Sequence, residues 1–143
     1  EGTRYPEQKM ALDAEGKACE YGKGYWVRGV VDLMIIDGDT AFIIDYKTGS
    51  NKYPEPKQLK LMALMAFAHY PEINRIKAGL LFVVHNSFLT EEYTRADVHK
   101  LWDAFYPDLN RLDTSYIKDV WNPNPTPLCG WCPVNTCPHH KER

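Results

Sequence analysis

A strongly helix-forming segment lies between two apolar segments of strand length, and this order constrains the fold more than any other feature. Pro56 to Tyr70 is rich in Lys, Leu, Met and Ala, with Pro71 just beyond its end, which predicts a helix that is apolar on most faces and well buried. Ala41 to Tyr46 precedes this helix, and the apolar run Ile76 to Val84 follows it as a predicted central strand. Strand, helix and strand in this order predict a crossover unit, in an α/β fold with a mixed central β-sheet flanked by helices.

Two more strands are predicted before this unit and a long helix after it. Gln8 to Leu12 and Trp26 to Ile36 are rich in β-branched and apolar residues and are bounded by turn formers. Asp37-Gly38-Asp39 then predicts a tight hairpin. Thr94 is placed as the N-cap of a long helix, which Pro107 should kink or split in two.

The composition is that of a globular domain. The chain has 143 residues, of which 44% are hydrophobic and 25% charged, so we expect one domain that needs no metal merely to fold. The formal net charge of -2 argues against a strongly basic DNA-coating protein but leaves room for a local DNA-binding patch. The longest uncharged run in the middle of the chain, Leu61 to Ala68, is far below the ~20 apolar residues of a membrane span. We therefore expect a cytoplasmic protein without a membrane partner.

The end of the chain has a different character. Asn122 to Pro127 carries three prolines and predicts an extended connection. We predict a core over residues 1–121 and a cysteine-rich metal-binding tail over residues 122–143 that packs on the core.

Three charged residues lie in strands that are otherwise apolar. Asp45 and Lys47 are two apart on one predicted strand, so their side chains point the same way. If Gly38-Asp39 forms the hairpin turn, Asp32 lies directly opposite Asp45; with the turn one residue earlier it lies opposite Ile43, on the same face. A three-residue loop would break this parity.

Two interpretations of these charges stay open. Asp45 and Lys47 can form a structural ion pair, since Asp-x-Lys tripeptides are common. Asp32 adds a second carboxylate to the same face, and a net negative pocket suits a hard cation such as Mg²⁺ or Mn²⁺.

The motifs that carry this chemistry occur in a recognisable order. Gly29-Val-Val-Asp32 is followed by Ile43-Ile-Asp45-Tyr-Lys47-Thr-Gly49 and then by Gln58 at the start of a helix. This order, from about Glu7 to Leu64, resembles the PD-(D/E)xK nucleases of the RecB type. The resemblance implies a restriction-endonuclease-like core and a metal-dependent DNA nuclease, with exonuclease activity expected and a phage-encoded relative as the nearest analogy.

The resemblance also implies roles for individual residues. Asp32 and Asp45 would hold Mg²⁺ or Mn²⁺, and the backbone carbonyl of Tyr46 would assist. Lys47 would orient or activate the attacking water, with Gln58 completing the catalytic set.

The sequence departs from the family pattern at two points. RecB-type enzymes usually have Tyr four residues after the glutamine, where this chain has Met62. They also usually take a further metal ligand from an upstream helix, and no helix is predicted before the first strand. We expect either that Glu7 or Glu20 substitutes for that ligand or that the helix lies upstream of Glu1.

The tail has three cysteines at metal-ligand spacing. Cys129 and Cys132 form a Cys-x-x-Cys pair, and Cys137 follows closely. Zinc would complete a four-ligand site with His139 or His140, whereas an iron–sulfur cluster prefers a fourth cysteine. Reduced thiols without metal are the third alternative.

A second resemblance favours iron and sulfur in the tail. RecB-like nucleases of the AddB and CRISPR-associated kinds carry a comparable three-cysteine run with one cysteine far upstream, which implies Cys19 or a residue before Glu1 as the fourth ligand. The rival to an enzyme is a non-catalytic DNA-binding module with a structural zinc or iron–sulfur site. The intact set of Asp32, Asp45 and Lys47 argues against that rival.

Overall fold

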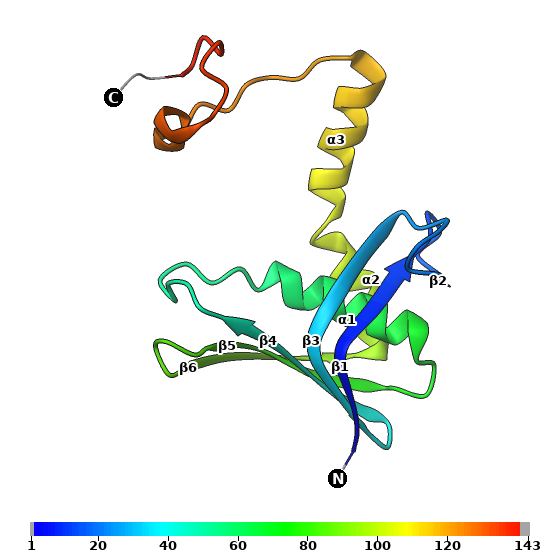
Figure 1. Cartoon of the computed structure of the whole chain (residues 1–143). Coiled ribbons are helices and arrows are strands. Elements are labelled where there is room, and N and C mark those ends of the chain that lie inside the picture. The colour runs from blue at the N-terminus through cyan, green and yellow to red at the C-terminus, as the bar shows by residue number, and fades with distance from the viewer. Residues whose placement is uncertain (1, 141–143) are drawn as a thin grey trace. The chain divides into compact units, whose positions relative to one another are not determined.

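The computed structural model describes residues 2–140, which divide into two compact units, one running through Tyr106 and one starting at Pro107. The first unit holds a mixed sheet and the helix α1 (Figure 1), and the second holds most of α3 and the tail. The strands are β1 (Thr3–Leu12), β2 (Ala18–Cys19), β3 (Val27–Asp37), β4 (Thr40–Lys47), β5 (Arg75–Phe82) and β6 (Ser87–Thr94). The helices are α1 (Lys57–His69), η1 (Arg95–Asp97), α2 (Val98–Asp103), α3 (Tyr106–Lys118) and η2 (Pro127–Trp131).

Within the described residues the strands form a six-stranded sheet in the order β2-β1-β3-β4-β5-β6. Only β4 and β5 pair in parallel, and the other neighbours are antiparallel. A parallel pair needs a crossover connection, and α1 supplies it. The prediction of a mixed α/β sheet with a β4–α1–β5 crossover is therefore confirmed.

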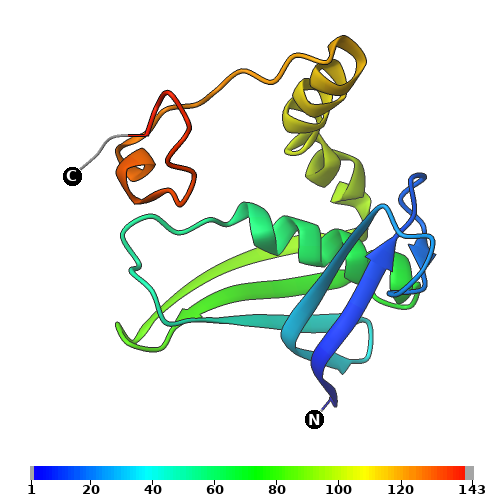
Figure 2. The same cartoon turned by 45° about the horizontal axis from the view of Figure 1, so that its top comes forward.

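The core lies between α1 and one face of the sheet, and two views show α1 running along that face (Figures 1 and 2). Seven residues of α1 are buried, which agrees with the predicted helix that is apolar on most of its faces. Gly29 on β3 lets α1 come close, because a Cβ there would lie 2.7 Å from Met65 Cε. The largest fully buried side chains are Met10, Leu12, Met34, Ile43, Leu59, Met65, Ile73, Ile76, Leu80 and Val31.

On strands β1 and β3, the alternation of buried and exposed side chains is interrupted at positions that lie opposite each other. Val31 and Met34 are both 0% exposed although they are three residues apart, whereas strict alternation would bury residues two apart. On β1 the change falls at Glu7, whose φ of 47° is left-handed and unusual for a residue with a side chain. The register continues on either side of this point, so Glu7 lies opposite Asp32.

The segment after β5 differs from the prediction. Ser87–Thr94 forms the edge strand β6, which the sequence analysis missed, and Thr94 makes no side-chain N-cap bond. The helical region then divides into α2 and α3, with the break just before Pro107. The predicted split is correct, because proline clashes with the carbonyl four residues earlier and cannot donate to it. No helix in the described part of the chain is long and apolar enough to cross a bilayer.

Candidate active site

The candidate site lies where β3 and β4 separate. Their ladder runs from the hairpin to Leu33↔Ile44 and ends there, while the last residues of β4 pair with β5 alone. Gly38-Asp39 forms the turn, so Asp32 occupies the position next to Asp45 in the continued register. The first of the two predicted registers is therefore correct.

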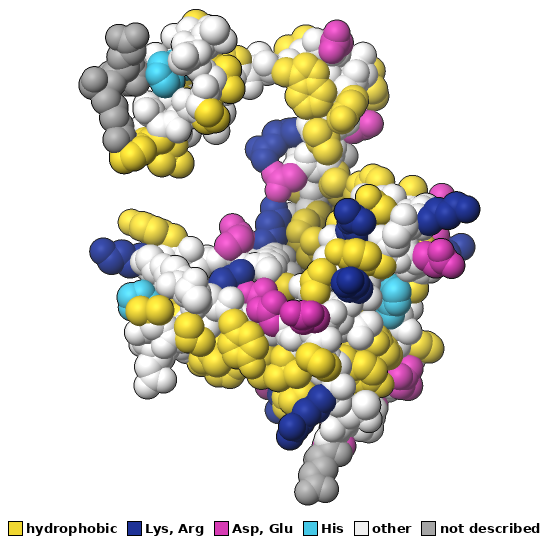
Figure 3. Space-filling view, viewed as in Figure 1, with side chains coloured by type: hydrophobic (Ala, Val, Ile, Leu, Met, Phe, Trp, Pro, Cys, Tyr) yellow, Lys and Arg dark blue, Asp and Glu magenta, His cyan; other side chains and the backbone are white. Residues whose placement is uncertain are grey.

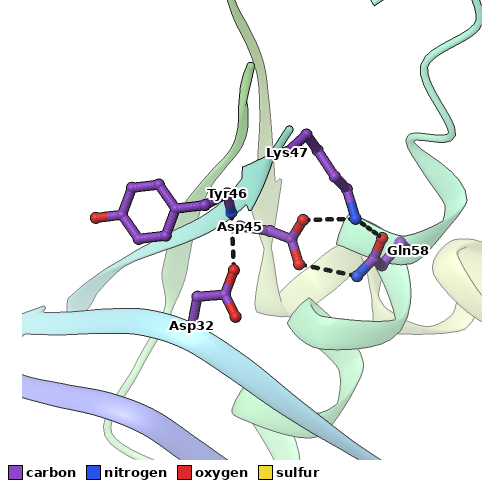
Figure 4. Close-up of polar contacts among 5 residues, drawn as sticks. All are labelled: Asp32, Asp45, Tyr46, Lys47 and Gln58. Carbon is purple, nitrogen blue, oxygen red and sulfur yellow. Dashed lines mark hydrogen bonds and ion pairs between the residues drawn. The ribbon is translucent and has the colours of Figure 1, made fainter. Parts of the chain in front are cut away.

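The carboxylate of Asp32 bridges the opening of this fork. Its Oδ2 accepts a hydrogen bond of 2.8 Å from the backbone N–H of Tyr46 (Figure 4). A side-chain oxygen of β3 thus replaces the backbone acceptor that a continued ladder would have supplied. This contact fixes Asp32 beside the residue that follows Asp45.

Asp45, Lys47 and Gln58 form a closed polar triangle. Gln58 Nε2 donates to Asp45 Oδ1 at 2.9 Å, and Lys47 Nζ donates to Gln58 Oε1 at 2.7 Å. Lys47 Nζ also lies 2.7 Å from Asp45 Oδ2. Gln58 stands in the first turn of α1, so the crossover helix carries the residue that connects the acid to the base (Figure 4).

Asp45 is the one buried charged residue in the described core, with 5% of its surface exposed. Its Oδ2 has the ammonium of Lys47 at 2.7 Å and accepts no hydrogen bond from the described residues. A buried carboxylate oxygen without a hydrogen-bond donor is costly unless a cation compensates it. Lys47, whose side chain is 33% exposed, supplies only one positive charge for the two carboxylates.

The donor set fits a hard divalent cation. Oxygen ligands from two carboxylates, with a backbone carbonyl beside them, are the chemistry that Mg²⁺ and Mn²⁺ prefer. The buried and unsatisfied Oδ2 of Asp45 and the half-buried Asp32 are the observations that support this fit. Asp32, Asp45 and the carbonyl of Tyr46 are therefore the residues that could hold such an ion.

The expected third acidic ligand is not assembled here. Glu7 lies opposite Asp32 on β1 but is exposed, and Glu20 follows β2. Across residues 2–140, no group of three or more His, Cys, Asp or Glu side chains stands in an arrangement that could hold a metal ion. The structure thus brings together Asp32 and Asp45, and Glu7 stays a prediction.

Two of the tail cysteines accept hydrogen bonds from backbone N–H groups of nearby residues in the second unit. Cys129 Sγ accepts from the backbone N–H of Thr126 at 3.3 Å, at the start of η2. Cys137 accepts through its carbonyl from His140 N–H at 2.9 Å. Among the described residues, His140 Nδ1 is buried and has no hydrogen-bond partner.

Cys19 lies on β2 in the first unit, and it is a free thiol like Cys132 and the other tail cysteines. Partial burial, reinforced by the carboxylates of Asp13 and Glu20, raises the pKa of the Cys19 thiol. A raised pKa opposes the thiolate form that metal ligation requires.

Arg95 is a structural residue that the sequence analysis missed. Its guanidinium donates to the backbone carbonyls of Phe67 at 3.0 Å and Tyr70 at 2.7 Å, and also to that of Ile73. These carbonyls lie at and just beyond the C-terminal end of α1, where helix carbonyls lack partners. Arg95 therefore anchors the helix whose other end carries Gln58.

Comparison with known proteins gives one structural likeness and one family. The crystal structure of SSO0001 is similar to it at 15% sequence identity, with a TM-score of 0.46 over 96% of this chain and 61% of that chain. The chain thus spans less than two thirds of that protein's length. A search of curated proteins finds no match. The family model of the PD-(D/E)XK nuclease superfamily matches residues 3–138, a range that includes both acids, the lysine and the tail cysteines. The chain belongs to the PD-(D/E)XK nuclease superfamily.

Proposed function

We propose that the chain is a Mg²⁺- or Mn²⁺-dependent deoxyribonuclease that hydrolyses phosphodiester bonds with Asp32, Asp45 and Lys47. One observation carries the proposal: buried Asp45, whose Oδ2 has the Lys47 ammonium beside it and accepts no hydrogen bond from the described residues, lies next to a second carboxylate at the β3–β4 fork. A purely structural Asp45–Lys47 pair would not require Asp32 at that place. Membership of a nuclease superfamily gives the reaction class.

Asp32 and Asp45 hold the cation in this proposal. A divalent ion held there would polarise the scissile phosphate and lower the pKa of its bound water. The hydrogen bond from Tyr46 N–H fixes Asp32 through Oδ2, and Gln58 fixes Asp45 through Oδ1. Lys47 contacts Asp45 Oδ2, so an ion bound at this oxygen would share it with the lysine ammonium.

Lys47 is the group that acts on water and on the developing charge of the phosphate. Its ammonium lies 2.7 Å from both Asp45 Oδ2 and Gln58 Oε1, and its side chain reaches solvent. It therefore stands beside the ion-binding oxygen without being enclosed. Gln58 orients Lys47 because its Oε1 accepts a hydrogen bond from the lysine ammonium. Gln58 is therefore a positioning residue.

The finer assignment is an exonuclease of the RecB type acting on DNA. The order of Gly-x-x-Asp32, Asp45-Tyr-Lys47 and Gln58 on two strands and the crossover helix supports it. The substitution of Met62 for the usual tyrosine removes one family contact, and Met62 is 5% exposed and belongs to the core instead.

The tail metal is a separate proposal. Zinc would be held by Cys129, Cys132 and Cys137 with His139 or His140, and the buried Nδ1 of His140, which has no hydrogen-bond partner among the described residues, supports His140. Binding would have to bring these side chains together, because the described residues contain no such assembled group. An iron–sulfur cluster would need Cys19 or another cysteine as its fourth ligand. Metal and sulfide analysis of anaerobically purified protein distinguishes the two: one zinc per chain supports His140, and iron with sulfide supports the cluster.

The nuclease proposal is tested with linear, circular and single-stranded DNA, each incubated with Mg²⁺, with Mn²⁺ or with chelator. We expect cleavage only with metal, its loss in Asp45→Asn, and a decrease of about 10²–10⁴-fold in Lys47→Ala. Asp103→Asn, on an exposed carboxylate, and Lys77→Ala, on the sheet face away from α1, are the matched controls. DNA binding without cleavage in every metal would support the non-catalytic alternative and overturn the proposal.

A further inference from the structure

A cluster of cations and aromatic rings lies outside the candidate active site, on β1, β3 and the loop that joins β2 to β3. Arg28 Cζ is 5.0 Å from the ring centroid of Tyr21 and 4.5 Å from that of Tyr25. Lys9 Nζ is 5.7 Å from the Tyr21 ring. We call Lys9, Tyr21, Tyr25 and Arg28 the tyrosine–arginine platform. In the space-filling view, basic, acidic and hydrophobic side chains lie together on the right side of the first unit (Figure 3).

The platform is ordered and open to solvent at the same time. Arg28 contacts both rings and reaches the Tyr21 carbonyl through Nη1 at 3.5 Å, which fixes the rings relative to β3. Tyr25 nevertheless keeps 40% of its surface exposed. At Gly22 and Gly24, an added Cβ would meet nothing within 4 Å, so the loop lies in open space.

A packing role alone explains little of this arrangement. Exposed cation–π contacts contribute only weakly to folding, and aromatic rings that serve folding are normally covered. Trp26, next to the platform, is 50% exposed as well. Rings held in place with their surface free are suited to stacking against another flat group.

We propose that the tyrosine–arginine platform binds single-stranded DNA next to the cleavage site, an inference that rests on the proposed nuclease function. Nucleic-acid bases stack on exposed aromatic side chains when they are unpaired, and neighbouring cations contact the phosphates. Arg28 and Asp32 lie four residues apart on β3, about 13 Å along the strand. The platform therefore lies on the same strand as Asp32, a short distance along it.

The local charge favours a single strand over a duplex. Residues 9–28 contain four Lys or Arg and three Asp or Glu, so the excess of positive charge is small. Duplex DNA presents its phosphates densely and keeps its bases stacked internally, and its binding depends mainly on cations. Stacking on tyrosine needs exposed bases rather than a large positive field.

The test measures binding by fluorescence anisotropy in chelator, with a labelled oligothymidine and with a duplex of equal length. We expect Tyr25→Ala to weaken oligothymidine binding by about 5- to 150-fold, the range of one lost base stack. Tyr25→Phe should keep parental affinity because the ring remains. Phe88→Ala removes a ring that is 54% exposed elsewhere on the sheet, and should change nothing.

The outcomes separate the platform from the nuclease. Weaker oligothymidine binding in Tyr25→Ala, with Tyr25→Phe intact, supports the platform even if no metal produces cleavage. Unchanged affinity in Tyr25→Ala overturns the platform even if the protein cleaves DNA. An equal loss on duplex and oligothymidine overturns the single-strand assignment. Should Tyr25→Ala unfold, Arg28→Ala with Arg28→Lys as its partner variant repeats the test on the cation.

Discussion

Replacing Gln58 by alanine tests whether the polar triangle has the geometry described. The change removes the 2.9 Å bond to Asp45 and the 2.7 Å bond from Lys47. It leaves Asp45, which is 5% exposed, with an ion pair as its only described side-chain contact. We therefore expect Gln58→Ala to lower the free energy of unfolding.

The size of this loss follows from the two ends of the amide. A hydrogen bond to a buried charged group contributes about 1.5–3 kcal/mol. The bond from Lys47 contributes less, because that side chain is 33% exposed and solvent screens it. Together they predict a destabilisation of about 2–3 kcal/mol.

Urea denaturation at neutral pH in chelator measures the loss without interference from metal, since an ion at a hundred times its Kd would itself add about 2.7 kcal/mol. Lys60→Ala, in the same turn of α1 and without a described side-chain bond, is the matched control and should change stability by less than about 0.5 kcal/mol. If Gln58→Ala is no less stable than Lys60→Ala, Gln58 does not satisfy Asp45 and the reasoning is wrong.

Three further predictions follow from contacts elsewhere in the first unit. Arg95→Ala should cost about 2–4 kcal/mol by leaving the C-terminal carbonyls of α1 without donors, and Arg95→Lys should not restore it in thermal or urea unfolding. Gly79→Ala should lower the free energy of unfolding by about 1–2 kcal/mol, because the new Cβ would lie 2.3 Å from the Phe88 ring. In a Phe88→Ala background the same change should cost nothing. An equal cost in both backgrounds would refute the clash. Cys19 should react with iodoacetamide at pH 8 more slowly than exposed Cys132, as followed by peptide mass spectrometry, because its raised pKa leaves less thiolate; faster labelling of Cys19 would contradict this.

Much of the fold was predictable because its signals are local. The Asp37-Gly38-Asp39 turn predicted the β3–β4 hairpin and left two registers, of which the structure has the first, and the apolar runs around α1 predicted the parallel crossover. Strand β6 was missed because Ser87–Thr94 alternates polar and apolar residues at a sheet edge next to a threonine that resembles an N-cap. The face change at Glu7 depends on a left-handed backbone conformation, which residue type alone does not reveal.

The candidate site was predictable for the residues on strands and less so for their partners. Period-two alternation placed Asp45 and Lys47 together, and the hairpin register added Asp32. The dual contact of Gln58 depends on how closely α1 approaches β4, which is a tertiary property. The hydrogen bonds from Arg95 to carbonyls at the end of α1 join residues at least 22 positions apart, and no pattern in a single sequence predicts such a contact.

The contact between Arg95 and the end of α1 sets a lower limit on the length of a working fragment. The residues that form the polar triangle and its neighbour all occur between Asp32 and Gln58, so a truncation after β5 would keep every one of them. Such a fragment would nevertheless lose both the edge strand β6 and the donor that closes the far end of the helix. The chemistry encoded in a short stretch of sequence thus depends on a chain that extends at least through Arg95, and the motif cannot be transplanted without it.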